Sequence, residues 1–381
     1  MYALVIGRAY PSETTGMMGI FEFEQAKALN NYGCEAVYAF CDTRSIKSLQ
    51  KFGYYNIVSN SVKVYGYHLP IKGLPQKIFS NIKKKCYKKI LDKIITIKGV
   101  PDIIHVHFPL LTLSEEIWEL LKDLKRPIVV TEHWTKVQIK NLEPFRITLL
   151  KQIVEESAEF ICVGEQLKKS VVDLTNTNRN IMVIPNMVSS EFYYEKPDME
   201  GLNKFNFVSV GRLMEVKRFN HVIEAFTLAF KGNKEAQLTI VGDGLLYNKL
   251  KRQIKDLDMN NQIQLTGFLS RKETAKLIKR SNALVSASVL ETFGVPFIEA
   301  MACGKPIIGI KNGPIDIYID ESNGILFEQE NVEDLARALK QMYAEMESYD
   351  NKKIADRAYE LFSEEAIAKC LKKTYEELIN S

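Results

Sequence analysis

The chain of 381 residues lacks any apolar run that approaches the roughly 18 residues needed to span a bilayer. Cysteine is scarce, and the six cysteines show no paired spacing, which argues against a disulfide framework and against a zinc site. The segment 1–7 runs directly into a strand-like pattern and has none of the features of a secretory leader. We therefore expect a cytoplasmic protein, at most peripherally bound to the inner face of the cell membrane.

A strong charge of either sign is also missing. The 51 lysines and arginines nearly balance the 47 acidic residues, and the net charge of +4 is too small to indicate a nucleic-acid partner. Hydrophobic residues make up 46% of the chain and charged residues 26%, which is ordinary for a globular protein. Because one core of typical size cannot accommodate 381 residues, the length predicts two domains.

Short apolar, β-rich runs alternate with amphipathic helical patterns along the chain, which is typical of α/β proteins with parallel sheets. We expect strands in the first half at 3–7, 36–40, 103–107, 128–131, 160–163 and 181–184. We expect strands in the second half at 205–210, 238–241, 263–266, 283–287 and 306–310.

The alternation of strands and helices defines the domains. It predicts an N-terminal domain over 1–185, a linker over 186–204, where the pattern breaks, and a second domain over 205–362. A last helix, over 363–381, lies past the second domain and is free to pack elsewhere. Ligands of open parallel sheets bind at the carboxyl ends of the strands, so a cleft between the domains is the expected site.

The most informative segment runs from Glu291 to Glu299 and follows the predicted strand 283–287. A helix is expected to begin near Pro296, which places Glu291 in the preceding loop and Glu299 about one turn inside the helix. Either glutamate alone would be better explained as a solvated side chain. Free backbone amides at the start of that helix could bind phosphate or sugar oxygens, and they belong to Phe293, Gly294 and Val295.

A second motif follows the predicted strand 205–210. Arg212 and Lys217 lie just beyond its carboxyl end, where the ligand of such a sheet is expected. A guanidinium and an ammonium at this edge could each contribute about 1.5–3 kcal/mol to binding a diphosphate if desolvated. Taken alone, the two side chains would be ordinary surface cations.

Together these motifs resemble the retaining glycosyltransferases of family 4, which have the GT-B fold. The resemblance covers nearly the whole chain, and its most specific part is the Glu291…Glu299 pair running into 300–306. It implies two Rossmann-like domains that face each other across a cleft, with the helix over 363–381 crossing back to the N-terminal domain. It also implies a nucleotide diphosphate sugar as co-substrate, with no metal and no other cofactor.

The resemblance assigns roles to individual donor-domain residues. Arg212 and Lys217 would bind the donor diphosphate, and Glu299 would bind the ribose. Glu291 would hold the transferred sugar together with the amides of Phe293 and Gly294. The remaining donor contacts would come from Val295 and from the base-pocket residues Gly267, Phe268 and Leu269.

The resemblance also covers the first domain. His133, in the segment 131–134 after a predicted strand, would lie near the sugar and is a catalytic candidate with Glu291. Gly19 occupies the place of the glycine loop that opens the first helix toward the donor, although the family's commoner form has two glycines. Further landmarks are Asn186, the glycine loop over 241–244 and the pair Asn323-Gly324.

The predicted activity is transfer of a hexose-type sugar, with retention, to a glycan or lipid-linked acceptor in cell-surface polysaccharide biosynthesis. One alternative is a sugar-nucleotide epimerase of the same fold, which would share the donor site but need no acceptor. Another is a non-enzymatic protein that binds membranes or polyanions. A dinucleotide-dependent dehydrogenase is disfavoured, because the first strand is not followed by a G-x-G-x-x-G turn.

Two further features can be explained either by an ordinary structural role or by a function. The segment 77–98 holds eight lysines and one acid, and it predicts an amphipathic helix whose lysines, Lys83 included, lie largely away from its apolar side. Such a surface could simply be solvated, or it could bind anionic lipid at about 1 kcal/mol per cation. His105 and His107 alternate on a predicted strand and could chelate a metal, but a structural role is favoured.

Overall fold

The computed structural model describes residues 1–11, 17–45, 52–196 and 204–381, and it divides them into two compact units. Unit 1 combines Met1–Met187 with Glu364–Ser381, and unit 2 is Val188–Ser363. The last helix therefore belongs with the first domain. Of the expected linker, 188–196 forms part of unit 2, and 197–203 lies outside the described residues.

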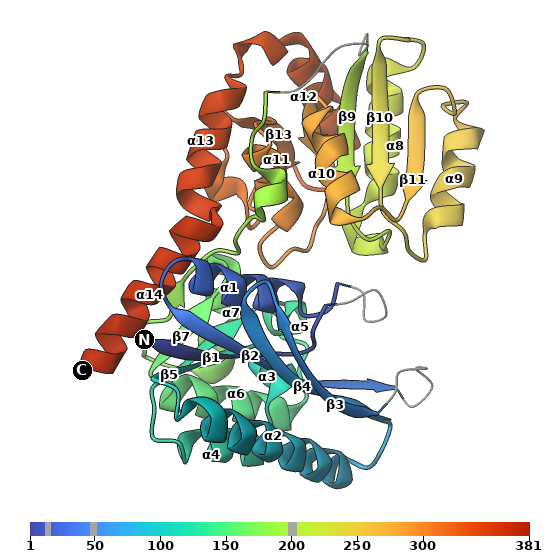
Figure 1. The fold of residues 1–381 in the computed structure, drawn as a ribbon. Coiled ribbons are helices and arrows are strands. Elements are labelled where there is room, and N and C mark those ends of the chain that lie inside the picture. Colours follow the sequence, from blue (N-terminus) through green and yellow to red (C-terminus); the bar gives the residue numbers. More distant parts are fainter. Residues whose placement is uncertain (12–16, 46–51, 197–203) are drawn as a thin grey trace. The chain divides into compact units, whose positions relative to one another are not determined.

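Unit 1 contains an eight-stranded sheet with the order β3-β4-β2-β1-β5-β6-β7-β8 (Figure 1). Its strands are parallel, except that β3 runs antiparallel to β4. The order reverses direction between β1 and β5, which makes their carboxyl ends a topological switch point. The strands are β1 (Tyr2–Gly7), β2 (Glu35–Ser45), β3 (Gly53–Ser59), β4 (Val62–Lys72), β5 (Ile103–His107), β6 (Ile128–Glu132), β7 (Glu159–Cys162) and β8 (Met182–Val183).

The hairpin of β3 and β4 was not expected from the sequence. Every second side chain of β3 is exposed, including Tyr54 and Val58, so the strand shows no continuous apolar run. Its register comes from β4, which in turn pairs in parallel with β2. An edge strand of this kind is defined by its neighbour rather than by its own hydrophobicity.

Helices cover both faces of the unit 1 sheet, with α1 and α2 on opposite faces (Figure 1). The helix α14 packs beside α1 and adds Ile367, Leu371 and Tyr375 to the core formed by β1, β2 and α1. The helices are α1 (Ile20–Asn31), α2 (Gln76–Lys98), α3 (Pro109–Thr112), α4 (Glu115–Lys122), α5 (Thr135–Gln138), α6 (Pro144–Glu156), α7 (Glu165–Thr175) and α14 (Glu364–Asn380).

Unit 2 contains a parallel six-stranded sheet with the order β11-β10-β9-β12-β13-β14. Its switch point lies between β9 and β12. The strand β12 is two residues shorter than predicted, because the chain leaves the sheet after Val285 to form the loop that carries Glu291. The strands are β9 (Phe205–Val210), β10 (Ala236–Val241), β11 (Ile263–Gly267), β12 (Ala283–Val285), β13 (Ile307–Ile310) and β14 (Gly324–Phe327).

Three helices of unit 2, α10, α12 and α13, begin at a side chain that caps the first turn. The helix α12 begins after Asn331, whose side chain accepts a hydrogen bond from the amide of Asp334 at 2.9 Å. The helix α8 buries an apolar stripe against the sheet, beside α12. The helices are η1 (Ser190–Phe192), η2 (Glu215–Lys217), α8 (Phe219–Phe230), α9 (Tyr247–Asp256), α10 (Arg271–Lys279), α11 (Val295–Ala302), η3 (Asp316–Tyr318), α12 (Val332–Ala344), η4 (Met346–Ser348) and α13 (Asn351–Phe362).

Within the ranges that the structure describes, no helix combines the length and the apolar character needed to cross a bilayer.

Candidate active site

The loops that follow β9 and β12 meet at the switch point of unit 2. The amide of Val289, after β12, donates a hydrogen bond to the carbonyl of Val216, after β9, at 3.0 Å. This contact brings together the two loops that carry predicted donor-binding residues. In open parallel sheets, this position is where ligands bind.

Lys217 and Glu291 form an ion pair between these two loops, joining the ammonium Nζ to the carboxylate Oε1. Both side chains are mostly but not completely buried, with 19% and 15% of their surfaces exposed. Two residues that are 74 positions apart in the chain, and that sequence reasoning assigned to one ligand, are therefore in contact. A diphosphate at this edge would compete with Glu291 for the Lys217 ammonium.

Glu299 is buried on α11 and pairs with a cation that the sequence analysis missed. Arg271, the first residue of α10, places Nη2 3.2 Å from Glu299 Oε1. The Arg271 guanidinium also lies 5.5 Å from the centroid of the buried Phe192 ring. Burying a carboxylate is costly unless a cation pairs with it, as Arg271 does here. No sequence motif links Arg271 to Glu299, and only its place just after β11 hinted at a role.

Other predicted donor contacts are Arg212, Gly267, Phe268 and Leu269. Arg212 follows β9 and is exposed, and it has no ion pair with Glu291 or Glu299 among the described residues. Gly267 ends β11, and the next residue, Phe268, is 70% exposed. Leu269 is half-buried before the start of α10. All of these residues lie at or just past the carboxyl ends of β9 and β11, which belong to the same edge of the sheet.

The helix α11 begins close to Pro296, where the sequence predicted its start. Gly294 precedes the helix with a φ of 95°, in the left-handed region that favours glycine. Val295 is the first helical residue, and Pro296 lies in the first turn. The Phe293 ring is buried and contacts the rings of Tyr318 and Phe362, so this residue offers its main chain rather than its side chain.

The glycine loop over 241–244 passes very close to the loop after β9. A Cβ atom on Gly242 would lie 1.9 Å from the carbonyl oxygen of Gly211, and one on Gly244 would lie 2.5 Å from that of Leu213. The amide of Leu213 donates to the carbonyl of Asp243 at 3.0 Å. Because these two glycines have no side chains, the loops after β9 and β10 can pack in direct contact.

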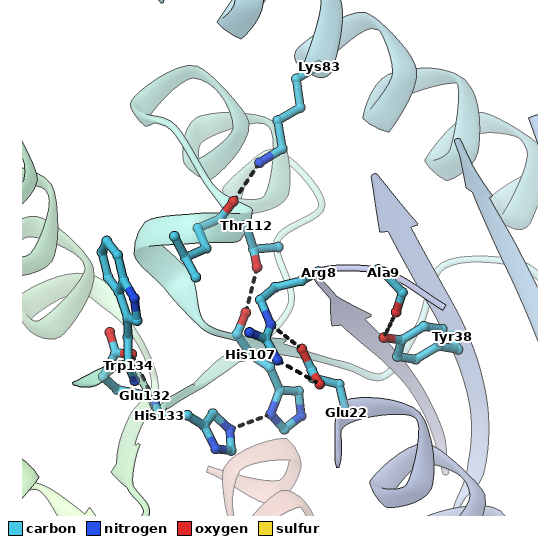
Figure 2. Close-up of polar contacts among 11 residues, drawn as sticks. Arg8, Ala9, Glu22, Tyr38, Lys83, His107, Thr112, Glu132, His133 and Trp134 are labelled. Carbon is cyan, nitrogen blue, oxygen red and sulfur yellow. Dashed lines mark hydrogen bonds and ion pairs between the residues drawn. The ribbon is translucent and has the colours of Figure 1, made fainter. Parts of the chain in front are cut away.

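A second cluster lies at the switch point of unit 1. Arg8 follows β1 and donates from Nε to Oε1 of the buried Glu22 at 2.7 Å (Figure 2). Its guanidinium carbon also lies 3.3 Å from the centroid of the Phe108 ring. Sequence reasoning missed both Arg8 and Glu22, although Arg8 directly follows the first strand. Gly19 precedes α1 with a φ of 87°, and a Cβ there would lie 1.9 Å from the Ala9 carbonyl oxygen.

His133 is buried beside this cluster. Its Nε2 lies 3.0 Å from His107 Nδ1, and its ring stacks on Phe108 with centroids 4.6 Å apart (Figure 2). The side chain of Asn186 forms a further hydrogen bond with it. Burial, with the Arg8 charge as a smaller cause, lowers the pKa of His133 to about 3. The imidazole is therefore neutral at physiological pH and is held by its neighbours.

His105 has the structural role favoured by the sequence analysis. Its Nδ1 lies 2.5 Å from the hydroxyl of Tyr375 on α14, and its Nε2 lies 2.7 Å from Oγ1 of Thr131. Burial lowers the pKa values of His105 and His107 well below the ordinary value. Across the described part of the chain, no group of three or more His, Cys, Asp or Glu side chains could hold a metal ion.

Replacing Tyr375 with phenylalanine should leave His105 Nδ1 buried without its partner. We expect the free energy of unfolding to fall by about 1–3 kcal/mol, the usual cost of such a group. Urea unfolding measured by fluorescence tests this, with Tyr349→Phe as the control, since that hydroxyl has no hydrogen bond in the part of the chain that is described. Equal midpoints for the two variants would contradict the structural role of Tyr375.

The basic helix α2 differs from the prediction at one position. Lys83 is buried, and its ammonium donates to the carbonyl of Leu111 at 2.9 Å, so it is not part of the lysine face. Burial lowers its pKa to about 8. The outer surface of α2 instead presents Ile78, which is 50% exposed, among exposed lysines that include Lys85, Lys88 and Lys89.

Both units match known protein families. The family model described as Glycosyltransferase Family 4 matches residues 23–192, and the one described as Glycosyl transferases group 1 matches residues 195–360. Among related proteins, an uncharacterised glycosyltransferase of Methanocaldococcus jannaschii is 30% identical over 299 residues, which cover 76% of this chain and 79% of that protein. The N-acetyl-alpha-D-glucosaminyl L-malate synthase of Bacillus anthracis is 26% identical over 295 residues, covering 73% of this chain and 75% of that protein.

Solved structures share the fold across the whole chain. The Anabaena protein HepE, in complex with UDP and glucose, has a TM-score of 0.73 at 16% identity, covering 99% of this chain and 100% of that one. A glycosyltransferase from Rickettsia africae has a TM-score of 0.76 at 17% identity, covering 100% and 99%. The chain therefore belongs to glycosyltransferase family 4 and has the GT-B fold.

Proposed function

We propose that this glycosyltransferase moves a hexose-type sugar from a nucleotide diphosphate sugar to a glycan or lipid-linked acceptor, with retention of configuration, in cell-surface polysaccharide biosynthesis. The observation that carries the proposal is the contact between Lys217 and Glu291 at the switch point of unit 2. There, a cation suited to a phosphate and a carboxylate suited to sugar hydroxyls lie side by side.

The neighbouring pair Arg271–Glu299 supports the same assignment. Its carboxylate is held on α11, one turn from the free amides at the start of that helix, where a diphosphate would bind. Glu299 could then accept hydrogen bonds from ribose hydroxyls, while Arg271 holds the other side of its carboxylate. The names of similar proteins support the chemistry, since HepE was solved with UDP and glucose and the Bacillus anthracis relative is an N-acetylglucosaminyl L-malate synthase.

The proposed mechanism follows from charge. The departing nucleoside diphosphate gathers negative charge on its β-phosphate, which Lys217, Arg212 and the start of α11 would stabilise without a metal. The acceptor would attack from the face that the phosphate leaves, and the phosphate oxygen would take the acceptor's proton. Glu291 would position the sugar, with His133 as a second contact. The glutamates would not act as the acid and nucleophile of a glycosidase.

A thermal-shift screen with UDP-, GDP- and ADP-sugars tests the donor assignment. Ligands that bind the folded state raise its melting temperature by mass action, so the screen needs no acceptor. We expect one nucleotide series to stabilise the protein, and incubation with that donor alone to leave the sugar configuration unchanged. Isomerised sugar would indicate the epimerase alternative, and no stabilisation by any donor would contradict the proposal.

Part of the proposal is that α2 brings the enzyme to the anionic inner face of the membrane. Each well-placed lysine contributes about 1 kcal/mol to binding such a surface, so replacing Lys85 and Lys89 with glutamine should weaken binding about 30-fold. Co-sedimentation with vesicles containing phosphatidylglycerol measures this. The matched control replaces Lys251 and Lys255, which are exposed on α9. Equal and weak binding to neutral and anionic vesicles would leave α2 as a solvated surface.

A further inference from the structure

Glu132 is a buried acid that the proposed mechanism does not use. It is the last residue of β6, at the carboxyl edge of the unit 1 sheet, and it is 0% exposed. Its Oε1 accepts hydrogen bonds from the backbone amides of His133 and Trp134, each at 2.8 Å. Its Oε2 is buried without a hydrogen-bond partner in the described part of the chain. Figure 2 shows Glu132 beside the turn that carries His133.

Burying Glu132 in this way lowers folding stability at neutral pH, so stability does not explain its presence. Burial raises the pKa of Glu132 to about 7 from an ordinary value of 4.5, although the two amide hydrogen bonds and the charge of Arg8 oppose the rise. Between pH 4.5 and about pH 7, the folded protein therefore retains the Glu132 proton, which the unfolded chain has already lost. Folding stability therefore falls as the pH rises from 4.5 to 7. Acids retained at such a cost concentrate at functional sites.

The groups that face Glu132 define its environment. Arg8 approaches from the loop after β1. His105 and His107 on the neighbouring strand β5 pair with Val129 and Thr131, whose side chains point to the other face of the sheet. Cys162 lies opposite Glu132 on β7. The histidines are neutral because their pKa values are lowered by burial, and burial raises the pKa of the Cys162 thiol. Glu132 is therefore the group in this cluster whose charge changes near neutral pH.

We propose that Glu132 is a positioning residue for sugar transfer. Its carboxylate fixes the backbone of His133 and Trp134, so that the His133 imidazole stays between Phe108 and His107 at the carboxyl edge of β6. The inference rests on the proposed function, in which His133 contacts the transferred sugar. Misplacing such a group by about 1 Å can cost 10²-fold in rate.

The test compares Glu132→Gln and Glu132→Ala with the wild type. Glutamine keeps an acceptor oxygen for both amides but does not titrate, and it accepts more weakly than a carboxylate. We expect the wild-type kcat to fall as the pH drops through 7. At pH 8, Glu132→Gln should lower kcat about tenfold and flatten this pH dependence, and Glu132→Ala should lower kcat about 100-fold. The KM for the donor should change less than about twofold, because the predicted donor contacts lie mainly in unit 2.

Glu159 provides a matched control. Its Oε1 accepts a hydrogen bond from the amide of the next residue, Phe160, at 3.0 Å, and burial raises its pKa, but it lies at the amino end of β7. Glu159→Gln should leave kcat and its pH profile unchanged. If Glu132→Gln behaves the same way, the positioning role is wrong.

A second readout does not depend on activity. Relative to the wild type, Glu132→Gln should gain several degrees of melting temperature between pH 5 and pH 8, since the cost of ionising a buried acid disappears. If the wild type transfers no sugar from any donor, the proposed function fails, while this shift still tests whether Glu132 titrates. A shift without any change in kcat would leave Glu132 a purely structural residue and overturn the inference.

Discussion

Replacing Lys217 with methionine is expected to lower the rate of sugar transfer about 100- to 1000-fold, the usual loss when a group that stabilises developing charge is removed. Methionine keeps the length of the side chain but cannot bind the β-phosphate, and Glu291 loses its ion-pair partner. The loss should appear mainly in kcat, because charge on the leaving group is greatest in the transition state. Steady-state kinetics with the donor found by thermal shift measures it.

Lys249→Met is the control for this experiment, since Lys249 is an exposed lysine of the same unit. It should leave kcat unchanged. A double variant with Glu291→Gln shows whether the two side chains act together, in which case the combined loss will be smaller than the product of the two single losses. A loss of less than about threefold for Lys217→Met would remove this residue from the donor site.

Replacing Gly242 with alanine should destabilise unit 2 by about 2–5 kcal/mol. The residue has a φ of 141°, which costs about 1–3 kcal/mol for an L side chain, and its new Cβ would lie 1.9 Å from the Gly211 carbonyl oxygen. Separation of the two loops should also abolish donor binding. Thermal unfolding with and without the donor measures both effects.

Gly232→Ala separates the effect of backbone strain from the effect of the steric collision. Gly232 has a φ of 86°, but nothing lies within 4 Å of a Cβ added there, so it carries the backbone cost without the collision. We expect it to cost only about 1 kcal/mol and to leave donor binding intact. If the two alanine variants are equally stable, then contact between the loops after β9 and β10 is not what excludes a side chain at Gly242.

The strands of unit 2 and the loops that follow them could largely be predicted from the sequence. The strand β9 has the predicted bounds, and the loops after β9 and β12 carry the predicted residues. The prediction succeeded because buried parallel strands are continuous apolar runs, and because residues just past their carboxyl ends share one edge of the sheet. The contact between Lys217 and Glu291 follows from this geometry.

Pairs that depend on tertiary packing could not be predicted. Arg271 lies 28 residues before Glu299, and Arg8 lies 14 residues before Glu22, and no local pattern marks either pair. In the sequence, Glu132 looked like an ordinary residue at the end of a strand. The two amides that donate to Glu132 and the burial of its second carboxylate oxygen appear only in the structure.

The error at Lys83 had a different origin. Cys86, Tyr87 and Ile90 follow it at intervals of three or four residues, so the helical period places Lys83 on the apolar face of α2. Its charge argued against that position, but the carbonyl of Leu111 satisfies the ammonium there. Periodicity was the better guide than charge.

Unit 1 consists of two pieces of the chain that are separated by the whole of unit 2. Unit 2 is contiguous and can fold as soon as it leaves the ribosome. During synthesis, the core of unit 1 instead stays incomplete until the last 18 residues have been made. Until then His105 lacks the Tyr375 hydroxyl, and the apolar surface later covered by α14 is open to solvent. A chain that ends before residue 364 would leave this part of the unit 1 core uncovered.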